Sequence, residues 1–183
     1  LGLDPVYYGH FTEAMGKACS STRAILTVHT SLVGETILRW GTEEQKNKWL
    51  PKMVNGEKIG CFCLSEPEVG TDAKSVQTHY KKEGDKFIVN GTKKWITLGD
   101  MADFFLVVTK GEKGHCAFII ERDMPGVTTT PIKGLMASRA AHIALINFEN
   151  VEVPAENLLA KEGSGFTYIV NTALDHGRYS IAW

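Results

Sequence analysis

The spacing of apolar residues changes twice along the chain, and these changes constrain the fold more than any other feature. Residues 7–40 are mostly good helix formers, with apolar positions that recur near a 3.6-residue period. Between residues 58 and 153 the apolar runs shorten to strand length, and helical spacing returns after residue 163. The sequence therefore predicts an α+β fold with a helical segment at 1–57, a β-domain at 58–153 and a linker with one helix at 154–183.

The first segment is expected to contain two helices. One long helix is predicted from about Tyr7 to Trp40. Thr42 and Gln45 have the spacing of a capping box, in which each side chain satisfies a backbone amide of the other residue. They predict a short helix over residues 43–50, and Pro51 is expected to end it because proline has no amide hydrogen to donate.

Seven short runs in the middle segment have the composition of strands. They are residues 59–64, 86–89, 93–97, 104–109, 116–120, 127–131 and 144–148. Asn90-Gly91 lies between the second and third runs and favours a two-residue hairpin turn there. Short strands with polar connections indicate a compact β-barrel or sandwich.

The charge balance argues against nucleic acid and anionic membranes as partners. The chain carries 20 basic and 21 acidic residues, a net charge of -1, which gives no electrostatic case for binding nucleic acid or an anionic membrane. No apolar run approaches the ~20 residues of a membrane-spanning helix, and no signal-peptide pattern opens the chain. We therefore expect small-molecule partners, and a cytoplasmic location or, in a eukaryote, the mitochondrial matrix. The four cysteines lack the density of a secreted disulfide scaffold and are interpreted as reduced.

Several common catalytic and metal-binding motifs are absent from the sequence. It contains no glycine-rich dinucleotide fingerprint, no P-loop and no G-x-S-x-G nucleophile elbow. The six histidines are scattered. Cys61 and Cys63 would share one face of a strand, but no second pair with zinc-like spacing accompanies them. Core packing is the favoured interpretation of these thiols, and no metal site is predicted.

Two segments place small hydroxyls and a flat ring where a planar ligand with a polar edge could meet them. Ser65 and Thr71 stand on either side of the Glu66-Pro67 turn, which follows an apolar run. Trp95 and Thr97 are two residues apart, and residues so spaced share a face on a regular strand. Taken singly, the first segment is equally well explained as a tight turn, and the indole as an ordinary hairpin aromatic. The presence of both segments in one chain indicates half of a flavin pocket.

Eight segments of the chain resemble the acyl-CoA dehydrogenase flavoprotein family, in order and in register. They are residues 40–51 (WGTEEQKNKWLP), 56–60 (GEKIG), 64–67 (LSEP), 70–72 (GTD), 90–91 (NG), 94–97 (KWIT), 148–154 (FENVEVP) and 174–178 (LDHGR). The resemblance covers essentially the whole chain and is greatest to short-chain, butyryl-CoA dehydrogenase-like members. It implies the end of an N-terminal helical domain, a middle β-barrel domain that binds flavin, and the start of a C-terminal helical bundle. Leu1 is not an initiator methionine, so we expect missing sequence at both ends.

The resemblance also assigns site residues. The implied cofactor is FAD, and its expected contacts are Phe62, Leu64, Ser65, Thr71, Trp95, Ile96 and Thr97. The carrier arm of the substrate is expected to contact Thr71, Asp175, His176, Gly177 and Arg178. In this assignment Ser65 hydrogen-bonds the polar edge of the flavin, the Trp95 indole covers one face of the ring, and the Thr97 hydroxyl lies near N5. The family completes the adenine end of the site from its C-terminal domain and a neighbouring subunit.

The implied reaction is α,β-dehydrogenation of an acyl thioester, in which a carboxylate removes the α-proton and the β-hydrogen leaves as hydride to flavin N5. Branched-chain and long-chain members carry the catalytic glutamate immediately before the arginine that corresponds to Arg178. This chain has Gly177 at that position. The base is therefore expected downstream of Trp183, and no catalytic residue is expected within the chain.

The resemblance further implies the partners. They are an acyl-CoA or acyl carrier protein thioester as substrate, an electron-transferring flavoprotein as electron acceptor, and a homotetramer or homodimer at full length. Glu68-Val69 replaces the glycine and small residue of many members, which raises the acyl carrier protein alternative. Two rival functions stay open: a flavin oxidase or monooxygenase of the same fold, and a non-catalytic relative that has lost FAD.

Overall fold

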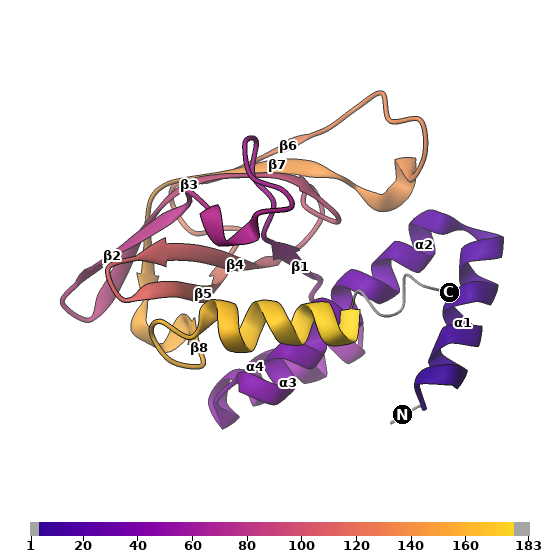
Figure 1. The fold of residues 1–183 in the computed structure, drawn as a ribbon, viewed down its shortest axis with the longest axis horizontal. Helices are drawn as coiled ribbons and strands as arrows, with labels where there is room; N and C mark the ends of the chain where they lie inside the picture. The colour runs from indigo at the N-terminus through magenta and orange to yellow at the C-terminus, as the bar shows by residue number, and fades with distance from the viewer. Residues whose placement is uncertain (1–3, 178–183) are drawn as a thin grey trace.

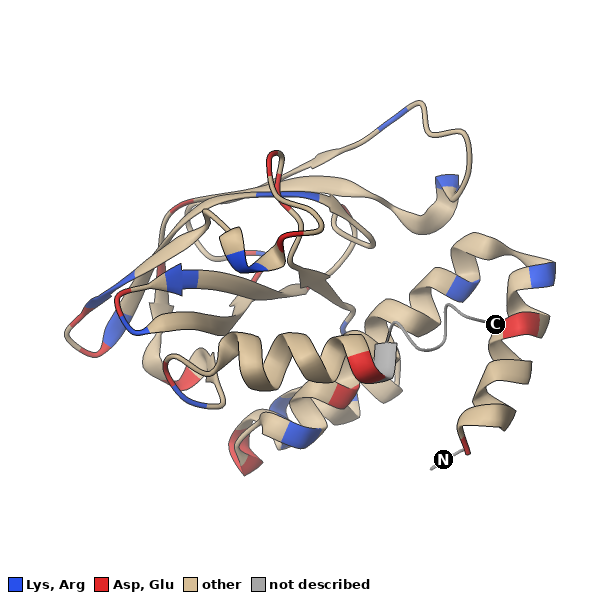
Figure 2. Ribbon diagram, in the orientation of Figure 1, with Lys and Arg blue, Asp and Glu red and all other residues tan. Residues whose placement is uncertain are grey.

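The computed structural model describes residues 4–177 of the chain. Most of the N-terminal helical segment lies against one end of a mixed β-sheet, the first helix stands apart from that sheet, and the C-terminal helix runs beside α3 and α4 under it (Figure 1). Acidic and basic residues are interspersed over the helices and the strand connections (Figure 2). Within residues 4–177, no helix is long and apolar enough to cross a membrane.

The N-terminal segment contains more helices than expected. They are α1 (Pro5–Ala18), α2 (Ser20–Ile25), the π-helical η1 (Leu26–Gly34), α3 (Glu35–Trp40) and α4 (Glu43–Val54). The prediction of one helix over residues 7–40 is wrong, because the backbone is extended at Cys19, with φ -162° and ψ 112°. The residues that follow, Ser20 to Thr22, have weak helix propensity and often occupy helix ends, which makes this a natural place for the break.

Helix α4 begins where the sequence indicated and ends later. Thr42 Oγ1 accepts a hydrogen bond from the Gln45 amide at 3.2 Å, and Gln45 Oε1 accepts one from the Thr42 amide at 3.0 Å, so the capping box is confirmed. Pro51 lies inside the helix instead of ending it. Trp49 and Met53, on either side of it, are both buried in the core, and their packing outweighs the loss of one helical hydrogen bond.

Eight strands form a single mixed sheet. They are β1 (Gly60–Cys63), β2 (His79–Glu83), β3 (Lys86–Ile96), β4 (Phe104–Gly111), β5 (Gly114–Glu121), β6 (Val127–Pro131), β7 (Ala144–Pro154) and β8 (Leu158–Leu159). The order is β6-β7-β3-β2-β4-β5-β8, and β1 pairs in parallel with β4 off this path. Within the described residues β6 and β8 end the path without pairing to each other, so the expected barrel is wrong and the sheet is open.

The predicted hairpin at Asn90-Gly91 is also wrong, because β3 runs through these residues as one strand. A register shift against β7 falls between Val89 and Gly91, and Gly91 has φ 144°. The hairpin turn instead lies at Gly84, with φ 63°, between β2 and β3. Strand β2 gave little signal in the sequence because only Tyr80 within it is buried.

Short helices complete the described chain. They are the 3-10 helices η2 (Ala73–Ser75), η3 (Arg139–Ala141) and η4 (Ala155–Asn157), and the π-helical η5 (Gly165–Val170) and η6 (Ala173–Gly177). Residues 171–172 join η5 to η6 as helix, so the helix expected after residue 163 is confirmed.

The helices and the sheet share a hydrophobic core. Phe104 of β4 packs on Trp49 of α4, with ring centroids 4.3 Å apart. The same cluster includes Ile37 from α3 and Ile169 from η5. The sheet, the N-terminal helices and the C-terminal helix all bury side chains in this one cluster. Their relative positions are therefore fixed by packing.

Candidate functional site

A cavity of about 250 Å³ lies where the N-terminal helices, the sheet and the C-terminal helix meet. It is lined by Arg23, Ala24, Thr27, Val28, Leu32, Phe62, Leu64, Ser65, Trp95, Ile96, Thr97, Ala173 and Leu174. The expected cofactor contacts all line this one cavity, with the exception of Thr71. The helical part of its wall was not anticipated from the sequence.

The two predicted ligand segments adjoin because β1 and β3 end near each other. Phe62 lies in β1, and Leu64 and Ser65 follow that strand directly. The Ser65 carbonyl accepts a hydrogen bond from the Lys94 amide of β3 at 2.9 Å, which joins the segments by their backbones. Phe62, Leu64 and Ile96 give this part of the cavity an apolar lining, and Ser65 and Thr97 add hydroxyls.

The backbone of Trp95 departs from a regular strand. Its φ is 63°, and the pairing of β3 with β7 shifts register between Lys93 and Ile96. The expectation that Trp95 and Thr97 share a face by simple alternation is therefore wrong. Both residues nevertheless line the cavity, and the indole stays 52 % exposed. An exposed flat ring at a cavity is available to cover a planar ligand.

A buried ion pair, which the sequence reasoning missed, lies behind the Ser65 segment. Lys93 Nζ is 2.8 Å from Glu66 Oε1, and the two side chains are 0 % and 3 % exposed. Lys93 Nζ also donates to the Leu64 carbonyl at 3.0 Å. The signal was present in the sequence: Lys93 is in phase with Phe87 and Val89, two of the buried residues of β3.

Both charges of this pair are compensated. Burial raises the pKa of the Glu66 carboxyl, but hydrogen bonds from Lys93, Thr78 and Gln77 outweigh burial and hold the pKa below its usual range. Glu66 Oε2 accepts from the Gln77 amide at 2.6 Å, and Oε1 accepts from the Thr78 amide at 2.9 Å. Burial lowers the pKa of the Lys93 ammonium, and the carboxylate opposes this effect. With three donors on the carboxylate, the ionised pair is the favoured state.

Of the predicted carrier-arm residues, Thr71 and Asp175 have described side chains, and neither lines the cavity. Thr71 is exposed in the loop between β1 and η2, and it does not line the cavity. Asp175 is exposed on η6, one residue after Leu174, which does line it. His176 and Gly177 continue the backbone of η6, and Arg178 lies outside the described residues.

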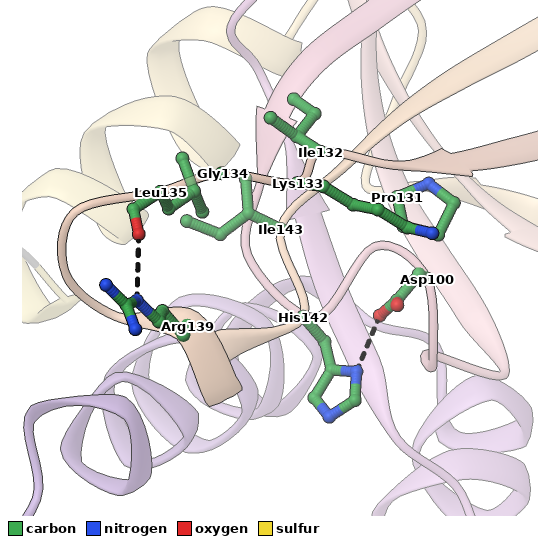
Figure 3. A pocket seen from close by; sticks show the side chains of 9 residues that line it. All are labelled: Asp100, Pro131, Ile132, Lys133, Gly134, Leu135, Arg139, His142 and Ile143. Carbon is green, nitrogen blue, oxygen red and sulfur yellow. Dashed lines mark hydrogen bonds and ion pairs between the residues drawn. The ribbon is translucent and has the colours of Figure 1, made fainter.

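A second and larger cavity, of about 590 Å³, lies under the connection between β6 and β7. Figure 3 shows His142 directed at Asp100, with Nδ1 2.9 Å from Oδ1. It also shows Arg139 donating to the Leu135 carbonyl, a bond of 3.0 Å. The Leu98 amide donates to the Ala141 carbonyl at 2.8 Å, so this connection braces the segment that follows Trp95.

The cysteines of the sheet are buried free thiols. Cys61 and Cys63 lie in the core with their sulfurs 3.8 Å apart, and burial raises the pKa of the Cys61 thiol well above its usual range. Their location agrees with the core-packing interpretation. In the part of the chain that the structure describes, no group of three or more metal-ligating side chains occurs.

Comparison with known proteins gives consistent results. The family model "Acyl-CoA dehydrogenase, middle domain" matches residues 61–151, and "Acyl-CoA dehydrogenase, N-terminal domain" matches residues 1–57. The short-chain specific acyl-CoA dehydrogenase of Clostridium acetobutylicum is 42 % identical over 99 % of this chain and 49 % of its own length. The chain thus spans about half the length of the curated relatives it matches.

Solved structures show the same likeness. A glutaryl-CoA dehydrogenase from Mycobacterium smegmatis in complex with FADH2 has a TM-score of 0.93 at 34 % identity, over 98 % of this chain and 46 % of its own. The prolyl acyl carrier protein oxidase AnaB has a TM-score of 0.90 at 32 % identity, over 98 % of this chain and 50 % of its own.

Proposed function

This chain belongs to the acyl-CoA dehydrogenase family, and from that premise we propose that it supplies the flavin-ring site of an enzyme that dehydrogenates acyl thioesters between Cα and Cβ. The observation that carries the proposal is the single cavity that unites residues 62–65 with residues 95–97. FAD, when bound, would supply the hydride acceptor of this reaction.

The donor set and the shape of the cavity fit a flavin ring. Pockets for drug-sized ligands usually measure roughly 300–1,000 Å³, so a cavity of about 250 Å³ suits the ring and not the whole dinucleotide. Ser65 and Thr97 offer hydroxyls for the polar edge of such a ring, and Trp95 offers a flat face. The rest of FAD would then be held by residues outside this cavity.

The lining residues also suggest how the chain prepares the site. Phe62, Leu64 and Ile96 exclude water, which strengthens any hydrogen bond that Ser65 or Thr97 makes to a ligand. Thr71 and residues 175–178 are proposed to contact the carrier arm of the substrate. No carboxylate lines the cavity in the described residues, in keeping with a base supplied by another part of the enzyme.

The test uses the protein at its full natural length. We expect a yellow protein whose flavin absorbance bleaches without oxygen when butyryl-CoA is added. Thr97→Ala should slow the bleaching, and Thr97→Ser, which keeps the hydroxyl, should retain it. A protein that takes up no FAD even when incubated with it, or that bleaches with neither butyryl-CoA nor an acyl carrier protein thioester, would contradict the proposal. Fast reoxidation of the reduced protein by air would favour the oxidase alternative.

A second substrate class is favoured by the helical wall of the cavity. Arg23 and Thr27 are four residues apart, and both line the cavity. An arginine and a threonine on one wall of a cavity suit an acyl group that ends in a carboxylate, such as glutaryl. Arg23→Met should lower the rate of bleaching by glutaryl-CoA about tenfold or more relative to butyryl-CoA, whereas Arg23→Lys should lose less. Equal effects on both thioesters would exclude this substrate class.

The remaining assignments follow from the family. We propose that electrons leave the enzyme to an electron-transferring flavoprotein, and that the full-length protein is a homotetramer or homodimer. Its proposed location is the cytoplasm, or the mitochondrial matrix in a eukaryote. Light scattering of the full-length protein and flavin turnover with and without that acceptor protein test the first two assignments.

A further inference from the structure

We propose that Lys93 and Glu66 are positioning residues for the cofactor: the pair orients the Ser65 segment and keeps the net charge behind the flavin ring at zero. This inference rests on the proposed function of the 250 Å³ cavity. Lys93 belongs to β3, two residues before Trp95, and Glu66 directly follows Ser65. The ion pair therefore connects the two segments that form the proposed ring site.

The first argument is the direction that the pair imposes on Ser65. Lys93 Nζ holds the Leu64 carbonyl at 3.0 Å, and the Lys94 amide holds the Ser65 carbonyl at 2.9 Å. The Glu66 amide donates to the Val69 carbonyl at 2.9 Å and closes the turn that follows. Backbone groups before, at and after Ser65 are thus bonded to the protein, and the Ser65 residue faces the cavity.

The second argument is the reach of the carboxylate. Its two oxygens accept the amides of Gln77 and Thr78, which stand immediately before β2. Glu66 therefore ties the beginning of the loop over residues 67–76 to its end. Thr71, the proposed contact for the carrier arm, lies inside that loop. One buried side chain thus fixes the proposed ring segment and the base of the proposed carrier-arm loop.

The third argument is the cost of the arrangement. Taking two charges out of water costs several kcal/mol for each ion, and apolar residues of similar volume often fill such a site with equal or greater stability. A pair kept only for stability is therefore a poor choice at a position that is 0 % and 3 % exposed. A fixed pair of opposite charges, however, orients the backbone and leaves no net charge behind a redox ring.

The experiment separates charge from packing. In the full-length protein loaded with FAD, Lys93→Met leaves a buried anion, which should lower the flavin reduction potential. Glu66→Gln leaves a buried cation, which should raise it. The double variant Lys93→Met/Glu66→Gln restores neutrality, and its potential should return to that of the natural protein. Lys86→Met is the matched control, because Lys86 lies in the same strand and pairs with Glu152 at 2.7 Å on the surface, so the potential should not move.

FAD affinity is the second readout. The double variant should bind FAD about tenfold or more weakly, because it loses the bond to the Leu64 carbonyl and because a glutamine side chain in place of Glu66 offers one acceptor oxygen to two backbone donors. If the single variants do not fold, the FAD titration of the double variant alone tests the positioning role. Natural affinity in the double variant, or equal potentials in folded single variants, overturns the positioning role. A natural protein that binds no FAD contradicts the proposed function instead.

Discussion

A few single residues in and beside the proposed site have an unusual backbone conformation. Trp95, Leu98, Ser138 and His142 all have positive φ, between 51° and 67°, and none of them is glycine. They fall in two segments that hydrogen bonds join, from the Leu98 amide to the Ala141 carbonyl and from the Asp100 amide to the His142 carbonyl. Each such residue costs about 1–2 kcal/mol, so the surrounding contacts must hold this region in place. Strain of this kind is often found at binding sites.

Gly91 gives a sharp test of the bulge in β3. A Cβ at this position would stand 2.6 Å from Thr78 Cα, and its φ of 144° is unfavourable for other residues. Gly91→Ala should therefore destabilise the protein by roughly 2–4 kcal/mol. Gly84→Ala is the matched control, since Gly84 also has positive φ but has no atom within 4 Å of an added Cβ, and it should cost about 1 kcal/mol. Equal midpoint shifts in urea unfolding would show that Thr78 does not restrict this position.

The same residues explain which parts of the site could be predicted from the sequence. Ser65, Trp95 and Thr97 stand in local motifs, and the structure places them at one cavity. Arg23 and Leu174 line that cavity only because segments far apart in the sequence pack together. A local sequence motif does not predict such contacts. Lys93 was missed because lysine side chains are usually exposed. Only the alternation of buried and exposed positions along β3 indicates that this one is buried.

At the scale of elements, local signals succeeded where packing agreed with them. The capping box of α4 formed as its spacing indicated. The Asn90-Gly91 turn did not form, because β3 pairs with β2 as far as Asn90 and with β7 on both sides of these residues, so the strand continues through them. The open sheet was mistaken for a barrel because strand order and closure depend on long-range pairing, which hydrophobic spacing does not reveal.

Gln45 links the start of α4 to the sheet and yields a second prediction. Besides its role in the capping box, Gln45 Nε2 donates to the Glu156 carbonyl at 2.7 Å and to the Leu158 carbonyl at 3.0 Å. Gln45→Ala should cost about 3 kcal/mol, one part for the cap and the rest for two carbonyls left without this donor. Thr42→Ala loses only the cap and should cost about 1 kcal/mol. Urea unfolding measures both, and a smaller loss for Gln45→Ala would remove the proposed link.

At the scale of the whole molecule, the helices and the sheet are expected to unfold together. Trp49 is 3 % exposed and packs on Phe104 across the boundary between α4 and β4. Trp49→Ala should destabilise the chain by roughly 3–5 kcal/mol and should lower the stability of helices and sheet alike. Circular dichroism and tryptophan fluorescence should then report one coincident transition.

Trp95→Ala provides the control for that prediction. Trp95 is 52 % exposed, so its removal should change stability by no more than about 1 kcal/mol while it weakens ligand binding at the cavity. Separate transitions for the two spectroscopic signals in Trp49→Ala would contradict a shared core. A large loss of stability in Trp95→Ala would show that the indole supports the fold.

The 250 Å³ cavity is lined by residues from four stretches of the chain, 23–32, 62–65, 95–97 and 173–174. No early portion of a growing chain contains all four stretches, so the site comes into being only after the C-terminal helix has docked. A molecule that binds there recognises only chains in which all four stretches have packed together, and it stabilises them by mass action. Occupancy of this cavity would thus report that these helices and the sheet have docked, and a cell short of that molecule would degrade more of the protein it makes.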